Sequence, residues 1–443
     1  MSKNVLMGFA RKDITPTESV PLRGYGNTSR RMSGPVIDPQ YTTCMAFSDG
    51  DTTVLLFTSD LTGHGAIADV FLRPAISEAV GLPINNIHLS ASHNHSAADV
   101  DNKEVPSIPR YNEYLKDQLI AAAKEALADM AETQIFVTDI QTQGLNFVRH
   151  YILEDGTYAG DNFGHFDLSP IKCHESEADR QLQLVKFVRA GRKDVILANF
   201  QGHPHRLGGF HKPEITSDVV GAFRTEMENR TGCLLAYATG ASGNQNSSSR
   251  VKSEMAAETW LDHGRILADY AEEAMKNFRQ VSAEGVGIVS LDLDMPINHS
   301  MDHLLEEAKK IYALWLETND HKLCSDEAVR YGLNSPYHAG AIIRRVEMPA
   351  TFDVSIHAIK VGEVGIAVAP VEMFDTLGMS IKERSPFQCT VVATCANSGK
   401  GYLPSQLGWD HGGYSCDTTR FSPGSGEEIA DHYVDLLTKL HNA

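Results

Sequence analysis

The sequence lacks the features of a membrane-spanning protein and of a cysteine-based metal site. Its longest apolar stretches, such as residues 364–369 (VGIAVA), fall far short of the roughly 20 residues that a membrane-spanning helix needs. The seven cysteines stand singly, without a C-x-x-C pair, and an odd number cannot pair completely within one chain. Isolated cysteines of this kind are typical of a reducing compartment and argue against zinc bound by thiolates.

We also expect neither a secretory leader nor a basic surface. The N-terminal residues MSKNVLMGFARKDITP contain no long apolar segment after a basic start, so we expect a cytoplasmic protein. Acidic residues outnumber basic ones, and the formal net charge is -18. Because such a surface repels phosphate groups and anionic lipids, we expect neither a nucleic-acid partner nor stable membrane association. A small-molecule substrate remains, and a homo-oligomer is left open.

Strand and helix patterns alternate over most of the 443 residues. Apolar runs rich in strand-forming residues predict strands at residues 53–59, 86–90, 135–139, 182–188, 195–200, 233–239, 286–293, 352–361, 364–369 and 390–395, with a tight turn at 362–363. Helical spacing predicts helices at residues 66–80, 111–132, 254–278, 301–320 (exposed) and 427–440. This order favours an α/β fold of mixed β-sheets flanked by helices, in a single catalytic domain over residues 1–443.

Polar residues stand at or just past the ends of five predicted strands, namely Asp60, His93, His203, the loop at Gly240 and Asn397. Ligands of open α/β sheets bind beyond the carboxyl ends of the strands. We therefore expect these loops to meet and to build one site.

Two short histidine motifs point to a metal ion. Residues 92–96 (SHNHS) place His93 and His95 two positions apart on an extended segment, so that both can face the same way. In residues 202–205 (GHPH), the proline between His203 and His205 restricts the direction of both rings. Each motif alone is also compatible with an ordinary loop. Because imidazole is a preferred zinc ligand, two such motifs at strand ends favour a metal site.

Three further segments carry candidate groups. The loop at residues 237–246 (YATGASGNQN) is rich in small residues, which let its backbone approach a ligand closely. Ser242 in this loop lacks the G-x-S-x-G pattern of a nucleophile elbow, and a structural turn is the better interpretation from the sequence alone. Glu372 follows a fully apolar strand, where a carboxylate needs a partner such as a metal. Tyr402 and Tyr414 lie in glycine-rich loops, which by themselves indicate loop packing.

Together these segments resemble, in type and order, the motifs of the neutral/alkaline ceramidase family. The similar segments are residues 8–16 (GFARKDITP), Gly24-Tyr25-Gly26, residues 90–96 (SASHNHS), His203-Pro204, Glu372 and Tyr402, and the likeness runs from about residue 8 to residue 438. The resemblance implies a catalytic zinc ion held by His93, His203, Glu372 and Tyr402. It also implies that His95 lies beside the metal, and that Arg149 and Tyr414 contact the substrate or the developing oxyanion.

The sequence departs from the family at three points, the first of which is that we expect no secretory leader, although the ceramidases are secreted or membrane-attached. Where the family has G-D-V-S-P-N, residues 240–245 are GASGNQ, so that the family's serine matches Gly243 without a gap or Ser242 with one gap. We also expect no counterpart of the family's additional C-terminal immunoglobulin-like domain.

We therefore expect a zinc-dependent hydrolase that cleaves an amide (N-acyl) bond of a small soluble substrate. In this mechanism, zinc-activated water attacks the carbonyl. The oxyanion is stabilised by Tyr402, Tyr414 or Arg149. The substrate-binding groups come from His205, Ser242 and Asn244. The alternatives are a zinc-dependent lyase or isomerase that stabilises an enolate, an esterase or lactonase, and a non-catalytic metal-binding protein. Incorporation of solvent oxygen-18 separates hydrolysis from isomerisation.

Overall fold

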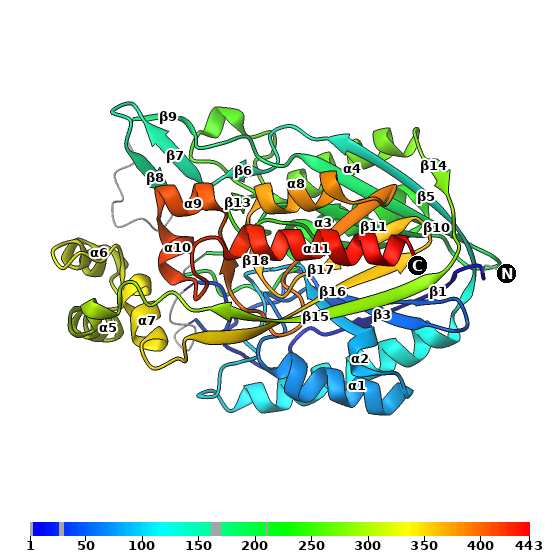
Figure 1. Ribbon diagram of the computed structural model, residues 1–443, viewed down its shortest axis with the longest axis horizontal. Coiled ribbons are helices and arrows are strands. Elements are labelled where there is room, and N and C mark those ends of the chain that lie inside the picture. The colour runs from blue at the N-terminus through cyan, green and yellow to red at the C-terminus, as the bar shows by residue number, and fades with distance from the viewer. Residues whose placement is uncertain (1–2, 26–30, 161–169, 210) are drawn as a thin grey trace.

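A nine-stranded mixed sheet forms the centre of the molecule, which the computed structural model describes for residues 3–25, 31–160, 170–209 and 211–443 (Figure 1). Its strands follow the order β12 (Leu234–Thr239), β11 (Val195–Phe200), β10 (Gln181–Arg189), β5 (Ala131–Gln141), β1 (Leu6–Asp13), β2 (Tyr41–Ser48), β3 (Thr53–Ser59) and β4 (Ile87–Ala91), with β14 (Arg279–Val281) also paired to β5. The pairs β3–β4 and β11–β12 at the two ends are parallel, and the pairs between them are antiparallel.

A four-stranded sheet packs face to face against the first. It contains β15 (Val286–Pro296), β16 (Thr351–Val361), β17 (Val364–Val368) and β19 (Cys389–Ala393), of which β17 and β19 are parallel. Alternate side chains of a strand point to opposite faces. On β2, Met45 and Phe47 enter the core between the two sheets, whereas Cys44 and Ala46 enter the core on the other face. Burial on both faces explains why many strands are continuous apolar runs.

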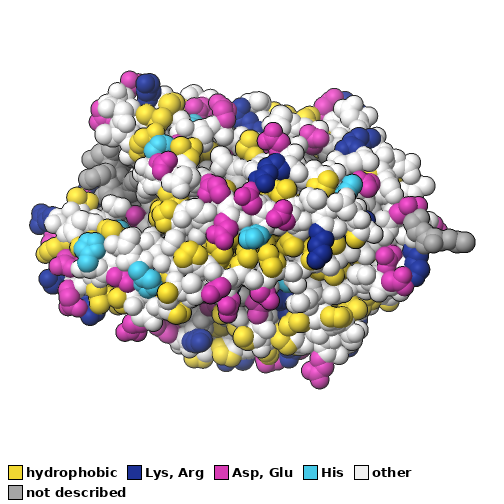
Figure 2. All heavy atoms as spheres, viewed as in Figure 1, with side chains coloured by type: hydrophobic (Ala, Val, Ile, Leu, Met, Phe, Trp, Pro, Cys, Tyr) yellow, Lys and Arg dark blue, Asp and Glu magenta, His cyan; other side chains and the backbone are white. Residues whose placement is uncertain are grey.

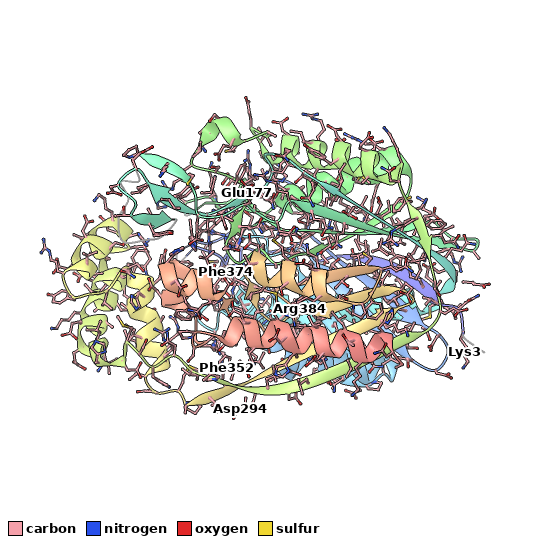
Figure 3. All side chains as sticks on the ribbon, turned by 45° about the horizontal axis from the view of Figure 1, so that its top comes forward. Lys3, Glu177, Asp294, Phe352, Phe374 and Arg384 are labelled. Atoms are coloured by element: carbon pink, nitrogen blue, oxygen red, sulfur yellow. The ribbon has the colours of Figure 1, made fainter. Side chains whose placement is uncertain are left out.

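Helices cover the outer face of each sheet, which gives four layers. The first sheet is covered by α1 (Arg73–Val80) and α2 (Ser107–Ala128) over β1–β4, and by α3 (Asp218–Thr231) and α4 (Trp260–Met275) over β10–β12. The second sheet is covered by α8 (Asp375–Arg384) and α11 (Ser425–His441). In Figure 3, Phe374 and Arg384 mark the two ends of α8. The predicted α/β fold of mixed sheets flanked by helices is confirmed.

Short elements surround the ends of the long strands. They are the paired strands β6 (Phe147–Val148) with β13 (Gln245–Asn246) and β18 (Glu372–Met373) with β20 (Tyr402–Leu403), the small sheet β7 (His150–Leu153), β8 (Tyr158–Gly160) and β9 (Ile171–His174), the helices α9 (Gln406–His411) and α10 (Tyr414–Thr418), and the helical turns Ala68–Leu72, Ile84–Asn86, Lys252–Glu254 and Asp302–Leu304. These elements carry most of the candidate site residues.

The sequence locates the long elements well and their ends less well. The predicted strands at 53–59 and 195–200 coincide with β3 and β11, and Gly362 adopts φ +58° in the predicted turn between β16 and β17. The predicted helix at 111–132 ends too late, because α2 stops at Ala128 and β5 begins at Ala131. The helix predicted from residue 254 starts at Trp260, where Thr259 and Asp262 form a capping box that satisfies its first amides.

Three helices between β15 and β16 form a cluster of their own, which we call the cap: α5 (Leu305–Thr318), α6 (His321–Val329) and α7 (Pro336–Arg345). The cap has a small core that includes Ile311 and Ile342, and it projects at one end of the molecule in Figure 1. The strands on either side remain paired up to Pro296 and Thr351. The helix predicted at 301–320 corresponds to α5, but it is not simply exposed, because Trp315 is buried within the cap.

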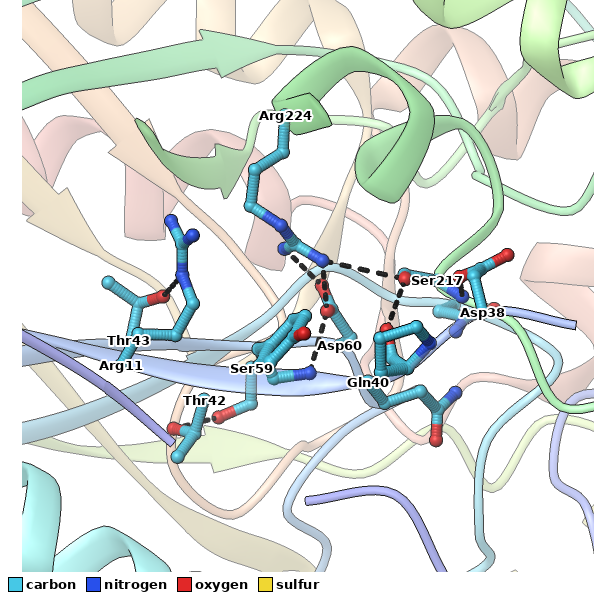
Figure 4. A network of polar contacts seen from close by, with 12 residues as sticks. Arg11, Asp38, Gln40, Thr42, Thr43, Ser59, Asp60, Ser217 and Arg224 are labelled. Atoms are coloured by element: carbon cyan, nitrogen blue, oxygen red, sulfur yellow. Dashed lines mark hydrogen bonds and ion pairs between the residues drawn. The ribbon is translucent and has the colours of Figure 1, made fainter. Parts of the chain in front are cut away.

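A buried ion pair joins the first sheet to α3 (Figure 4). Arg224 of α3 donates from Nη1 and Nη2 to the carboxylate of Asp60, which follows β3, at 3.1 and 2.8 Å. Ser217, just before α3, donates to Asp38 at 2.6 Å. Gln40 then donates to the carbonyls of Ser96 at 3.0 Å and of Thr216 at 2.9 Å. The network therefore fixes the loop that carries the first histidine motif.

The surface agrees with the acidic composition. On the face shown in Figure 2, acidic side chains are spread across the surface and basic ones stand mostly singly. Among the helices of the described residues, none combines the length and the apolar character needed to cross a bilayer.

Candidate active site

The predicted meeting of strand ends takes place at the edges of both sheets. Thr239, which ends β12, donates from its hydroxyl to the carbonyl of Ser92 at 2.7 Å. Thr394, which follows β19, donates from its backbone amide to the carbonyl of Thr239 at 2.9 Å. Asn397 accepts a bond from the amide of Leu89 on β4 at 3.0 Å. These bonds hold the loops after β4, β12 and β19 together, so that their side chains share one space.

A group of three histidines lies at this junction. The side chains of His93, His95 and His203 place one nitrogen each within 4.8 Å of one another, and all three residues are buried. A carboxylate oxygen of Glu372, Oε2, lies 3.2 Å from His93 Nε2 and 3.5 Å from His203 Nε2. Residues that are far apart in the sequence thus offer imidazole and carboxylate donors toward one point, which is the donor set of a catalytic zinc site.

Hydrogen bonds fix two of the rings with Nε2 toward Glu372. The Nδ1 of His93 is 2.9 Å from the carbonyl of Thr62, and the Nδ1 of His203 is 2.9 Å from the carbonyl of Gln245. Because a carbonyl only accepts, each Nδ1 carries the proton, a common arrangement for metal-binding histidines. His93 also adopts φ +65°, a left-handed conformation that is costly for a non-glycine residue and that often marks functional sites.

Two buried polar atoms at this point lack a hydrogen-bond partner among the described residues. They are Nε2 of His203 and Oε2 of Glu372, and the 3.5 Å between them is too long for a hydrogen bond. Unsatisfied buried polar atoms are costly, and a cation between them would satisfy both. The residues present therefore fit a metal ion.

The protonation states agree with this fit. Burial lowers the pKa of His203 to about 3, which leaves a neutral imidazole. Burial raises the pKa of Glu372, but the neighbouring His93 and His203 outweigh that effect and hold the pKa well below its usual range. Burial lowers the pKa of His93, whereas Cys395 and Glu372 raise it to well above its usual range. A metal ion would displace the proton that Glu372 favours on His93.

A cavity of about 780 Å³ opens over this candidate metal-binding group. Its base includes His93, His95, Glu372, Tyr402 and Tyr414. The cap forms one wall with Tyr312, Trp315, Leu316, Tyr337 and Arg344, and the opposite rim has Arg23, Asp99, Asp101, Lys103 and Glu104. Its volume is in the range of a small-molecule site.

Arg149 lies behind the two tyrosines. Its guanidinium carbon is 5.2 Å from the ring centre of Tyr402 and 5.7 Å from that of Tyr414. Its Nη2 donates to the carbonyl of Gly243 at 2.8 Å and to the hydroxyl of Ser415 at 2.9 Å. Arg149 is buried and is not part of the cavity lining, so these contacts make it a positioning group for both rings. Burial, followed by the charge of Glu372, raises the pKa of both tyrosines.

The structure does not bring the three predicted substrate-binding residues to the cavity wall. Asn244 uses its side-chain amide to donate to Asp375 at 2.7 Å and accepts from the Asp375 backbone at 3.0 Å. His205 lies 3.1 Å from the side chain of Asn246, with its ring centre 5.4 Å from that of His95. Ser242 is buried, and none of the three is among the described lining residues.

Packing leaves no room for a side chain at Gly243, the residue that matches the serine of the G-D-V-S-P-N motif without a gap. Gly243 donates its amide to the carbonyl of Met373 at 2.7 Å, and a Cβ on Gly243 would lie 2.3 Å from the carbonyl oxygen of Glu372. A serine at residue 243 would therefore push against the strand that carries Glu372. Within residues 240–245, the segment that matches the family's serine motif, the side-chain hydroxyl belongs to Ser242.

We expect Ser242→Ala to keep more than about a hundredth of wild-type turnover, because water rather than serine supplies the nucleophile at a metal site. Measurement of kcat with the metal-loaded variant checks this. A fall of roughly a million-fold, as for a true serine nucleophile, would show that Ser242 carries the reaction.

Comparison with solved structures identifies the fold. A neutral ceramidase from Pseudomonas aeruginosa matches with a TM-score of 0.74 over 100% of this chain and 75% of that chain, at 16% sequence identity. A ceramidase complexed with C2 matches with a TM-score of 0.72 over 99% of this chain and 76% of that chain, at 14% identity. The chain has a ceramidase-like fold. No protein-family model matches the sequence, and no curated protein matches it.

Within this ceramidase-like fold, several residues that sequence reasoning missed surround the metal-binding group. The carbonyl of Thr62 orients His93, and a backbone acceptor leaves no signal in side-chain motifs. Gly24 has φ +111°, and a Cβ there would lie 2.5 Å from the ring of His95. The motif Gly24-Tyr25-Gly26 was the available signal for this contact; Gly26 lies outside the described residues. The cap residues of the cavity wall gave no signal.

Proposed function

We propose that the protein is a zinc-dependent hydrolase that cleaves the amide bond of a small, soluble N-acyl substrate. The observation that carries the proposal is the convergence of His93, His95 and His203 at the base of a cavity of about 780 Å³, with the carboxylate of Glu372 beside His93 and His203. The ceramidase-like fold supports it, since a ceramidase by its name acts on an amide, ceramide.

The donor set favours zinc. Neutral imidazoles with one carboxylate and one open position are typical of catalytic Zn²⁺, whereas Mg²⁺ and Ca²⁺ prefer all-oxygen sites. In this proposal His93, His203 and Glu372 hold the ion, and Tyr402, whose backbone pairs with that of Glu372, is the fourth ligand. A zinc ion in such a site supplies Lewis-acid polarisation of a carbonyl and activation of water.

The surrounding side chains then bind the substrate and move protons. Burial and the neighbouring histidines hold the pKa of His95 well below its usual range, so the ring stays neutral and adds no charge that would repel a bound cation. Tyr414 lines the cavity with its ring centre 5.6 Å from that of Tyr402, and in this proposal its hydroxyl donates to the developing oxyanion while Arg149 holds both rings in place. A hydroxyl on a ring that is held in place in this way is a fixed dipole, and fixed dipoles stabilise the charge that develops in the transition state.

The other candidate functions have less support. The fold gives no support to a lyase or isomerase. A cavity of about 780 Å³ exceeds what a stored metal ion needs, which argues against a non-catalytic metal-binding protein. An esterase or lactonase would use the same groups, so esters and lactones belong in the substrate screen.

We expect the zinc-loaded protein to cleave short, polar, water-soluble amides better than long-chain ceramide. The rim of the cavity carries charged groups, with Arg23 paired to Asp99 at 3.4 Å and to Asp101 at 2.7 Å. Desolvating such groups against two alkyl chains is unfavourable. The measurement compares kcat/KM for N-acetylated sugars, N-acetylated amino acids, esters and lactones with that for short- and long-chain ceramides in detergent micelles.

The highest kcat/KM on ceramide would contradict the proposed substrate class and leave the metal site intact. Product formed in water enriched in oxygen-18 should carry the label, and unlabelled product would point to isomerisation or elimination instead.

A further inference from the structure

The cap contributes an arginine to the cavity that the proposed reaction does not use. Arg344 lies in the last turn of α7, exposed and part of the cavity lining together with Gly340, one turn earlier. A Cβ on Gly340 would lie 3.2 Å from Nη1 of Arg344 and 2.9 Å from the ring of Tyr312. The glycine therefore leaves the space into which the guanidinium folds, on the face of α7 that meets α5.

Arg344 has no ion pair or hydrogen bond with any residue that the structure describes. The neighbouring Arg345 shows what a structural arginine does in the same turn, since it is buried and donates to the carbonyl of Thr419. Cations near a helix C-terminus stabilise the helix dipole, and Arg345 already fills that role for α7. Arg344 is thus available to a ligand.

The other charged groups of the lining are carried by residues outside the cap. Arg23 is paired with Asp99 and Asp101 on the opposite rim, and Lys103 stands next to Glu104 in the chain. Glu372 would be neutralised by the metal ion. On the part of the described cavity wall that the cap forms, Arg344 is therefore the cation, and no carboxylate pairs with it.

The wall around Arg344 is aromatic and apolar. Tyr312, Trp315 and Leu316 line the cavity from α5, and Tyr337 lines it from α7 with its ring centre 5.6 Å from that of Tyr414. A guanidinium beside an apolar wall matches a ligand with both a carboxylate and an apolar group, because Arg binds a carboxylate through two parallel hydrogen bonds.

We propose that Arg344 binds a substrate carboxylate, so that the preferred substrate is an N-acyl amino acid or a similar small amide that carries a carboxylate and an apolar group. This inference rests on the proposed amide hydrolase function and names its substrate class.

Two matched pairs of probes test it with the zinc-loaded full chain. N-acetyl-L-phenylalanine is compared with its neutral carboxamide by acetate release, which places the charge on the amine side. N-succinylbenzylamine is compared with neutral N-succinamoylbenzylamine by benzylamine release, which places it on the acyl side. The wild type should prefer the charged member of at least one pair by roughly 10- to 100-fold in kcat/KM, the worth of a hydrogen-bonded charge.

The variants assign the preference to one residue. Arg344→Ala should remove it and leave the neutral probe within about threefold of wild type, and Arg344→Lys should keep part of it. Arg330→Ala is the matched control, because Arg330 belongs to the cap but is 74% exposed and paired with Glu327 on its own helix. An equal or inverted preference in the wild type, or a preference that survives Arg344→Ala, overturns the inference.

A binding measurement separates this inference from the reaction. Calorimetry with N-acetyl-L-phenylalanine on wild type and Arg344→Ala should show roughly tenfold weaker binding or more in the variant. Such a loss without turnover of any probe would retain the carboxylate site and refute the amidase. Turnover of neutral amides, with no effect of Arg344→Ala on binding or preference, would retain the amidase and refute the carboxylate site.

Discussion

The His203→Ala variant should be purified with almost no zinc, whereas the wild type should carry about one zinc ion per chain. His203 is buried, its Nε2 has no hydrogen-bond partner among the described residues, and its ring is held by the carbonyl of Gln245, so alanine removes one of the few donors of the site. Amide hydrolysis should fall in proportion to the lost metal. Elemental analysis of metal content, followed by assay before and after addition of zinc, gives both values.

His303→Ala serves as the control, since His303 is exposed and outside the cavity lining. That variant should keep wild-type metal content. Full zinc retention in both His93→Ala and His203→Ala would refute the site, whatever the activity of the two variants.

The Arg224→Met variant should lose about 3–5 kcal/mol of unfolding free energy. The side chains of Arg224 and Asp60 are only 10% and 4% exposed, so methionine would leave a buried carboxylate without its partner. Removal of one member of such a pair costs far more than the pair contributes, because the remaining charge is desolvated and uncompensated. Unfolding in urea, followed by circular dichroism, measures the loss.

Arg384→Met is the matched control. Arg384 pairs with Asp431, but these side chains are 46% and 63% exposed, and exposed pairs contribute roughly 0–1 kcal/mol. Equal losses in the two variants would contradict the assigned role of the Asp60–Arg224 pair. The loss in Arg224→Met should also appear at the site, because the same network holds the loop of His93 and His95 through Gln40.

The sequence predicts a strand or helix correctly where the segment's own side chains determine its secondary structure. The continuous apolar runs of β3, β11 and β17 identify buried strands without knowledge of their neighbours. By contrast, β2 (YTTCMAFS) is buried over most of its length yet rich in small and polar residues. Its identity as a strand comes from pairing with β1 and β3, which the sequence does not display. Similarly, α3 contains Gly221 and several polar residues, and packing on α4 stabilises it.

The site residues likewise divide into those that a local motif identifies and those whose positions depend on tertiary contacts. The family resemblance implied that His93, His203, Glu372 and Tyr402 lie near one another. The structure brings the side chains of His93, His203 and Glu372 together and pairs the backbone of Tyr402 with that of Glu372, although their binding of zinc stays a prediction. The position of Asn244 was not accessible from its motif, because its contact with Asp375 joins segments far apart in the chain. Arg344 was missed for a related reason, since residues 321–345 show no strong pattern and the cap takes shape only when α5 and α7 pack together.

The place of the cap in the chain has an evolutionary consequence. Residues 297–350 leave and rejoin the sheet at the paired residues Pro296 and Thr351, so both ends of the insertion start from neighbouring points of one hairpin. The insertion can lengthen, shrink or be exchanged without a change in strand register or in the histidines beneath it. The segment that forms one wall of the cavity is thus separable from the histidines at its base, and a chimera that carries another segment in place of residues 297–350 should change substrate while its metal content stays the same.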